Sequence, residues 1–155
     1  MSTVLEWHGP YRFADWPLAE VPLVAAGVYT IWENDSLVYV GMSGRGRTAD
    51  QLSEAQTSGR RVGLWTRLNS HASGRRSGDQ FCVYVADRLV LPTLTSTDID
   101  LIANDELRLD DLVRTYIRER MSFRFTETED GETASLLESR LRAGALDSKP
   151  LLNPR

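Results

Sequence analysis

The sequence predicts an α+β domain built on a small three-stranded antiparallel sheet that is flanked by helices. A β-branched and aromatic run at 27–32 is followed by turn residues and a second such run at 37–41, the pattern of a β-hairpin. Alternating apolar residues at 80–91 predict a third strand. The flanking helices are predicted by apolar residues at helical spacing, at 62–72, 110–120 and 132–143.

The rest of the chain is expected to be less regular. Residues 1–22 are rich in tryptophan and proline and predict an irregular N-terminal arm in front of a domain that spans 23–155. Residues 42–60 are rich in glycine, serine and arginine and predict a loop. A segment around 86–128, which ends in a short strand at 121–128, is expected to be an extra element beside the sheet.

Composition places the chain among ordinary globular domains. It has 155 residues, of which 41% are hydrophobic and 26% charged. The sequence contains no apolar run long enough to span a membrane and no secretory signal. Cys82 is the only cysteine and His8 and His71 are the only histidines, which excludes an internal disulfide and argues against a His/Cys metal cluster. We expect a cytoplasmic protein that does not contact membranes.

Positive charge is concentrated in one stretch of an otherwise acidic chain. The net charge of −4 argues against a general nucleic-acid binder. Residues 41–76, however, carry seven arginines against two acidic residues, and arginine binds phosphate in a bidentate manner. A solvated surface loop would explain the same cluster. The candidates for phosphate contacts outside a catalytic centre are Arg45, Arg47, Arg60 and Arg61.

Two tyrosines lie at matching positions in the predicted hairpin. Tyr29 ends the motif Gly27-Val28-Tyr29, and Tyr39 begins the motif Tyr39-Val40-Gly41. A two-residue turn would place the two tyrosines on opposite faces of the sheet, whereas a loop with an odd number of residues places them on one face. We therefore predict a three- or five-residue loop with both hydroxyls on the same face. Ordinary aromatic packing is the alternative role for both residues.

Three further residues are candidates for chemistry. Arg67 and His71 are four residues apart on a predicted helix, so they lie one above the other at the edge of its apolar face. They could bind phosphate and transfer a proton, or they could be solvated surface residues. Glu138 lies at the edge of the apolar face of the last helix, where it could face a cleft. Its alternative role is an i,i+4 salt bridge with Arg142.

Taken in chain order, these motifs resemble the GIY-YIG nuclease family. The resemblance extends from about residue 22 to residue 153. Its parts are the two name motifs at 27–29 and 39–41, Arg67 with His71 one turn later, Glu138 in a Leu-Glu pair, and Asn153 after a proline. The sequence departs from the pattern at Met42, where many members carry lysine.

The resemblance implies a metal-dependent endonuclease that hydrolyses phosphodiester bonds of DNA. It implies one Mg²⁺, with Mn²⁺ as a substitute, held by Glu138, and a phosphate bound by Arg67. The water would be deprotonated by Tyr29 or Tyr39, with His71 as the rival general base. A tyrosine of ordinary pKa, about 10, needs nearby positive charge to act as a base near neutral pH.

The partners implied are nucleic acids, with RNA open as an alternative to DNA. Asn153 joins the four arginines of the basic stretch as a nucleic-acid-binding candidate. No separate recognition domain is evident, so we expect low specificity, a branched substrate read by shape, or a targeting partner. Cutting both strands would also favour a homodimer.

Two other functions remain as alternatives. A non-catalytic nucleic-acid-binding module of the same fold would bind DNA in a salt-sensitive way and would not cleave it. A protein-interaction domain, which the overall acidity favours, would not bind DNA at moderate salt.

Overall fold

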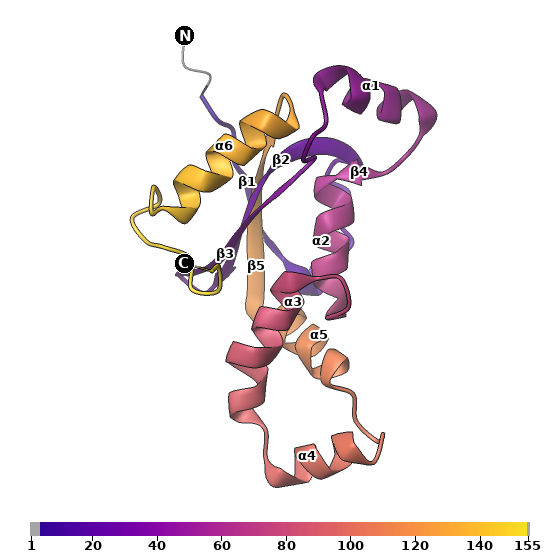
Figure 1. Ribbon diagram of the computed structural model, residues 1–155, viewed down its shortest axis with the longest axis vertical. Helices are drawn as coiled ribbons and strands as arrows, with labels where there is room; N and C mark the ends of the chain where they lie inside the picture. Colours follow the sequence, from indigo (N-terminus) through magenta and orange to yellow (C-terminus); the bar gives the residue numbers. More distant parts are fainter. Residues whose placement is uncertain (1–3, 155) are drawn as a thin grey trace.

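The computed structural model describes residues 4–154 and has an α+β fold (Figure 1). Its five-stranded mixed sheet has the order β1-β5-β2-β3, and β4 pairs in parallel with β2. The strands are β1 (His8–Arg12), β2 (Val24–Glu33), β3 (Ser36–Ser43), β4 (Val62–Gly63) and β5 (Met121–Thr128). The helices are α1 (Ala49–Ser58), α2 (Leu64–Ser73), α3 (Gln80–Val85), α4 (Ser96–Ala103), α5 (Leu109–Arg120) and α6 (Gly131–Arg142).

Helices cover both faces of the sheet. The larger core lies between the sheet and the helices α2, α3 and α5, and it includes Ile31, Phe123, Leu68, Phe81 and Ile117. The smaller core lies between the sheet and α6, and it includes Val28, Val40, Met42, Ala134 and Leu141. Alternate residues of β2 therefore face opposite layers. Figure 1 shows the sheet between α6 on one side and α2 on the other.

The turn of the hairpin differs from the prediction. Glu33 pairs with Ser36, so only Asn34 and Asp35 lie between the strands, and the predicted three- or five-residue loop is wrong. Asn34 has a φ of 53°, a left-handed conformation that asparagine tolerates and that tight hairpin turns require.

A β-bulge nevertheless places the two tyrosines on one face. The pairing of β2 with β3 shifts between Trp32 and Ile31, which leaves Val38 as the extra residue on β3. Beyond the bulge, Ile31 lies opposite Tyr39, two residues from Tyr29 on the same strand. The prediction of a shared face is confirmed, because the ring centroids of Tyr29 and Tyr39 are 6.4 Å apart.

The predicted third strand at 80–91 is wrong. Residues 80–85 form α3, and Ala86–Val90 continue it as a π-helical turn. Asp79 caps α3, since its side chain accepts a hydrogen bond from the backbone N–H of Cys82. The buried residues Phe81, Cys82 and Val85 share one side of this helix. A local cap and burial thus outweigh the preference of valine for strands.

Two other irregular regions of the prediction contain regular structure. The predicted loop at 42–60 includes α1, which begins at a capping box formed by Thr48 and Gln51. The N-terminal arm includes β1, which pairs antiparallel with β5 at one edge of the sheet. The predictions of a loop throughout 42–60 and of a wholly irregular N-terminal arm are therefore wrong. Residues 1–3 of the arm lie outside the described part of the chain.

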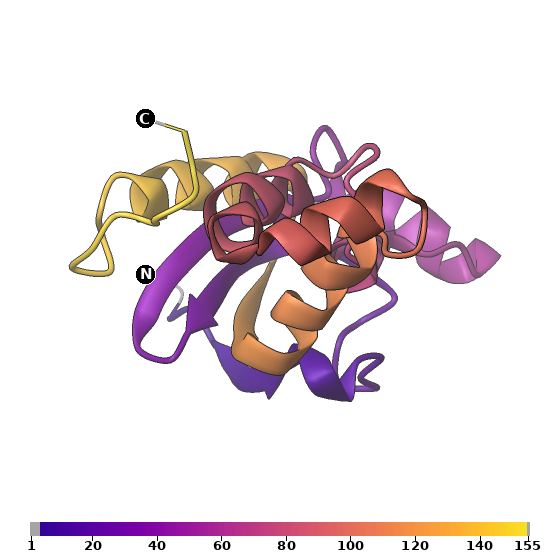
Figure 2. The ribbon, with the colours of Figure 1, turned by 90° about the horizontal axis from the view of Figure 1, so that it is seen from below.

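The predicted strand at 121–128 is confirmed as β5, but its place in the fold differs from the expectation. It pairs with β1 on one side and β2 on the other, so it is an interior strand. The extra segment expected beside the sheet therefore consists only of the helices between 86 and 120, which lie at one end of the sheet. Seen from the α4 end, these helices lie in front of the sheet (Figure 2). The predicted helices at 62–72, 110–120 and 132–143 are confirmed as α2, α5 and α6.

The last described residues run along the outer edge of β3. The backbone N–H groups of Leu151 and Leu152 donate to the carbonyls of Leu37 and Val38 at 3.2 and 2.8 Å. This contact covers hydrogen-bonding groups that an edge strand would otherwise expose. None of the helices formed by residues 4–154 has the length and apolar character needed to cross a membrane.

Candidate active site

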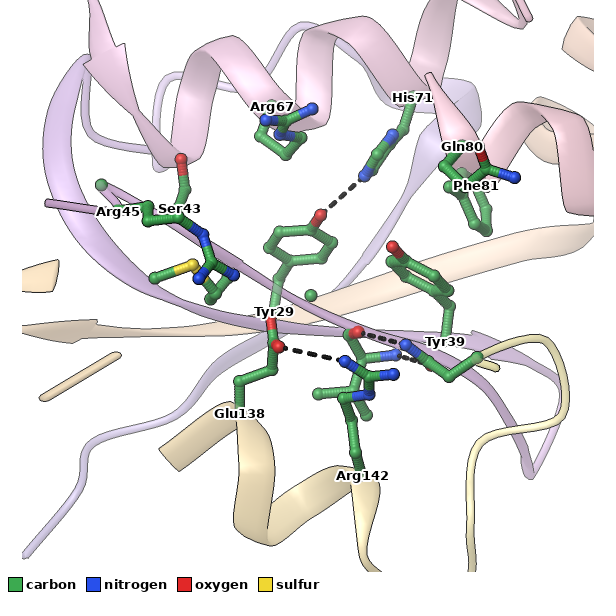
Figure 3. Close-up of a pocket in the computed structure, with 15 residues that line it drawn as sticks. Tyr29, Tyr39, Ser43, Arg45, Arg67, His71, Gln80, Phe81, Glu138 and Arg142 are labelled. Carbon is green, nitrogen blue, oxygen red and sulfur yellow. Dashed lines mark hydrogen bonds and ion pairs between the residues drawn. The ribbon is translucent and has the colours of Figure 1, made fainter. Parts of the chain in front are cut away.

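A pocket of about 330 Å³ opens beside β3, between α2 on one face of the sheet and α6 on the other (Figure 3). It brings together all five residues proposed for catalysis, which come from four different elements: Tyr29, Tyr39, Arg67, His71 and Glu138. Arg45 and Asn153 also line it. The structure thus places in one cavity residues that are up to 124 positions apart in the sequence.

Tyr29 lies on the central strand β2, opposite Gly41 of β3. A methyl group at Gly41 would overlap both the ring and the hydroxyl of Tyr29. The glycine of the second motif therefore gives the Tyr29 ring room to lie across β3. Tyr29 is 2% exposed, and its hydroxyl is 2.7 Å from Nε2 of His71.

His71 connects Tyr29 to a carboxylate that sequence reasoning missed. Nδ1 of His71 is 2.7 Å from Oδ2 of Asp79, and the Asp79 side chain is fully buried. The same oxygen accepts a hydrogen bond from the Ser70 hydroxyl at 2.7 Å. The available signal was an aspartate directly before 80–85, a typical helix cap, which the assignment of that run to a strand concealed.

The electrostatics of this pair fix its protonation near neutral pH. Burial opposes ionisation of Asp79, but the hydrogen bond and the charge interaction with His71, together with hydrogen bonds from Ser70 and the Cys82 N–H, outweigh burial and lower its pKa to about 2. Burial lowers the pKa of His71, and the contact with Asp79 opposes this shift only in part. Asp79 is therefore ionised while His71 is neutral.

These charge states determine the direction of both hydrogen bonds. An ionised carboxylate can only accept, so Nδ1 of His71 carries the proton that points at Asp79. Nε2 of the neutral ring then has a free electron pair, and the Tyr29 hydroxyl donates to it. The result is an ordered path from Tyr29 through His71 to Asp79.

Both tyrosines are protonated near neutral pH in this arrangement. Burial, reinforced by Tyr39, raises the pKa of Tyr29 well above its ordinary value, although Arg67 lowers it in part. Burial and the nearby Glu138 raise the pKa of Tyr39 to about 12. A free tyrosinate is thus costly here, whereas a tyrosine that gives its proton to His71 while it accepts another proton carries no net charge.

Glu138 is the single acidic residue among those that line the pocket. Its side chain is 13% exposed, and Oε1 is 3.4 Å from Nη1 of Arg142. The predicted i,i+4 pair with Arg142 is therefore present, at a long distance. One carboxylate with open space beside it fits Mg²⁺, which keeps several waters and often takes one protein carboxylate. Among residues 4–154, no three His, Cys, Asp or Glu side chains form a metal-binding cluster.

A basic hollow of about 470 Å³ lies next to the pocket. The two cavities share Ser43, Gly44, Arg45 and Arg67, and the hollow is also lined by Arg47 and Arg61. None of its ten lining residues is acidic. The Arg61 guanidinium lies 4.5 Å from the centre of the Trp65 ring, a cation–π contact that holds it at the rim.

Two nucleic-acid-binding candidates lie differently from the rest. Arg60 is exposed, does not line either cavity, and donates from Nε to the Ser58 hydroxyl at 3.3 Å. Asn153 lines the pocket, but both polar atoms of its amide bind the backbone of Val40, at 2.8 and 2.9 Å. In this arrangement Asn153 secures the end of the chain to β3.

No family model matches the chain. No curated protein and no solved structure matches it either.

Proposed function

We propose that this protein is a metal-dependent endonuclease that hydrolyses phosphodiester bonds of DNA and is related to the GIY-YIG nucleases. One observation carries the proposal: two tyrosines, an arginine, a histidine and a glutamate from separate segments line one pocket, which lies next to a basic hollow. The order of the motifs in the sequence supports the same assignment. The matching chemistry is a proton acceptor, a phosphate-binding cation and a metal-binding carboxylate.

Arg67 and Glu138 would act on the phosphate from the two sides of β3. Arg67 is exposed and lines both cavities, so its guanidinium can bind the scissile phosphate and stabilise the charge that develops on it. Glu138 would hold the metal, with water in the other positions. When bound, Mg²⁺ would supply charge neutralisation and polarise the attacking water.

Tyr29 is the proton acceptor that the contacts favour over Tyr39. As water attacks the phosphorus and the bond to the leaving 3′ oxygen breaks, the water proton passes to the Tyr29 oxygen, while the Tyr29 hydroxyl proton passes to Nε2 of His71. The leaving 3′ oxygen takes a proton from solvent water. The phenol stays neutral throughout, and the positive charge forms on His71 beside ionised Asp79. Tyr39 lines the same pocket and would orient the water or the phosphate.

The basic hollow would hold phosphates next to the cleaved one. Arg45, Arg47 and Arg61 are exposed and line a cavity next to the pocket. Contacts of this kind position the backbone without reading the base sequence. The hollow therefore favours a substrate recognised by backbone and shape.

The test is cleavage of supercoiled plasmid and of a labelled branched duplex with Mg²⁺, Mn²⁺ or EDTA. We expect nicking that requires the metal and is abolished in Glu138→Ala. The matched control is Glu132→Ala, an exposed acidic residue in the first turn of the same helix. DNA binding without cleavage by the wild type would overturn the proposal and favour the non-catalytic binding module.

A further inference from the structure

We propose that Asp79 is a positioning residue that holds His71 in the tautomer with the proton on Nδ1, so that Nε2 is free to take the Tyr29 proton. The catalytic consequence rests on the proposed nuclease function. The effect on the tautomer does not, because it follows from the hydrogen bonds of these three side chains alone.

The Asp79 carboxylate makes more contacts than a helix cap needs. Oδ1 accepts from the Cys82 N–H at 3.1 Å, and this bond is sufficient to cap α3. Oδ2 is used instead on α2, where it accepts from the Ser70 hydroxyl and faces Nδ1 of His71, both at 2.7 Å. The second oxygen thus contacts His71, which lines the pocket.

The surroundings of His71 leave this role to Asp79. The ring lies against Tyr29 from β2 and Tyr39 from β3, and Arg67 is one turn earlier on α2. Phe81 covers the ring with its centroid 4.7 Å away. Within the described chain, Asp79 is the acidic group that bonds to a ring nitrogen of His71. Removing its charge therefore removes the group that selects the tautomer.

The hydrogen bond that caps α3 determines how the side chain of Asp79→Asn would be oriented. The Cys82 N–H needs an acceptor, so the amide oxygen of the variant takes the place of Oδ1 and the NH₂ group takes the place of Oδ2. That NH₂ group faces Nδ1 of His71, which must then accept a hydrogen bond. The ring proton moves to Nε2, where it points at Tyr29 and blocks the transfer of the tyrosine proton.

The experiment reads the tautomer directly by ¹⁵N NMR of the two histidines at pH 7.5, and His8 serves as the internal reference. In the wild type we expect neutral His71 with its proton on Nδ1. In Asp79→Asn we expect the proton on Nε2. Cleavage should fall at least 100-fold with an unchanged dissociation constant for DNA, because the corresponding change in Ser-His-Asp triads lowers kcat by about 10⁴.

Two further variants keep the proposal falsifiable. Asp79→Ser retains a capping side chain without a carboxylate, and we expect it to lose the Nδ1–H preference and cleavage while α3 remains folded. Asp110→Asn removes a surface carboxylate that pairs with Arg76, and it should change neither the tautomer nor cleavage.

Two results would overturn the proposal: an Nδ1–H tautomer that persists in both Asp79 variants, or wild-type cleavage by a variant whose tautomer is reversed. If the wild type does not cleave DNA, the proposed function fails, but the NMR comparison still decides what Asp79 does to His71.

Discussion

The hydroxyl of Tyr29 lies 2.7 Å from Nε2 of His71, which joins the centre of the sheet to α2 across 42 positions of sequence. Because Asp79 faces the other ring nitrogen, this contact gives Tyr29 a proton acceptor inside the protein. The phenol can then accept a proton from water without first becoming a buried anion.

The pH dependence of cleavage should follow His71. Its pKa is lowered below 6.5, and the neutral ring is the active form, so cleavage should rise as pH increases through that lowered pKa and remain level from pH 7 to 9. The titratable and charged groups that face His71 are Tyr29, Tyr39, Asp79 and Arg67. Single-turnover rates between pH 5 and 9.5 provide the measurement.

A different profile would identify a different base. A rate that rises about tenfold per pH unit above pH 8 would indicate a free tyrosinate. A plateau that is lost in His71→Ala but kept in Tyr29→Phe would make His71 itself the base.

Gly41→Ala should disable the site with a limited effect on the fold. The added methyl group overlaps Tyr29, which must move away from His71. We expect cleavage to fall at least 100-fold and the free energy of unfolding to fall by about 1–3 kcal/mol, as for other overpacked sites. Urea unfolding and plasmid nicking measure the two effects.

The control is Gly59→Ala, at the C-terminus of α1, where φ is 72° and nothing lies within 4 Å. It should lose about 1 kcal/mol and keep cleavage. Equal cleavage by both variants would contradict the role of Gly41.

The basic hollow should account for the salt dependence of DNA binding. Replacing Arg45, Arg47 and Arg61 with alanine should weaken binding to all sequences equally, because we propose that these residues bind phosphates. Each lost phosphate contact should reduce the magnitude of the negative slope of log K against log salt by about 0.9. Fluorescence anisotropy between 50 and 300 mM salt measures this slope. Arg12→Ala, on the opposite edge of the sheet, is the matched control and should leave the slope unchanged. An equal effect of Arg12→Ala would place the DNA elsewhere.

Asn153→Ala should destabilise the end of the chain rather than remove a direct contact with DNA. The change removes two hydrogen bonds to Val40, which should cost about 1–3 kcal/mol of stability. Hydrogen exchange should accelerate at the amides of Val40 and Leu152, which lie along this edge. A loss of DNA affinity with unchanged exchange at these amides would instead make Asn153 a direct nucleic-acid contact.

Much of the site could be predicted from the sequence because its signals are local. The i,i+4 relation of Arg67 and His71 and the place of Glu138 at the edge of an apolar face need only the geometry of one helix. The shared face of the tyrosines was predicted for the wrong reason: a bulge at Val38 supplies what a longer loop would have supplied. Sequence alternation alone does not distinguish these two solutions.

The parts that were missed depend on contacts between distant segments. Residues 80–85 alternate like a strand, but they fold as a helix because Asp79 caps it and Phe81 enters the core. That error also concealed Asp79 as the partner of His71. The place of β5 inside the sheet depends on pairing with β2, almost a hundred residues earlier, and no local pattern encodes such a pairing.

The most direct test of the account compares binding and cleavage of one labelled branched duplex by the wild type, Tyr29→Phe and Glu138→Gln in the presence of Mg²⁺. Dissociation constants come from anisotropy with Ca²⁺ in place of Mg²⁺, and cleavage rates come from single turnovers with Mg²⁺, using the same protein preparations. We predict dissociation constants within about threefold of one another and rates at least 100-fold lower in both variants, about 2.7 kcal/mol of lost transition-state stabilisation. Wild-type rates in either variant would contradict the assignment of the pocket as the catalytic centre.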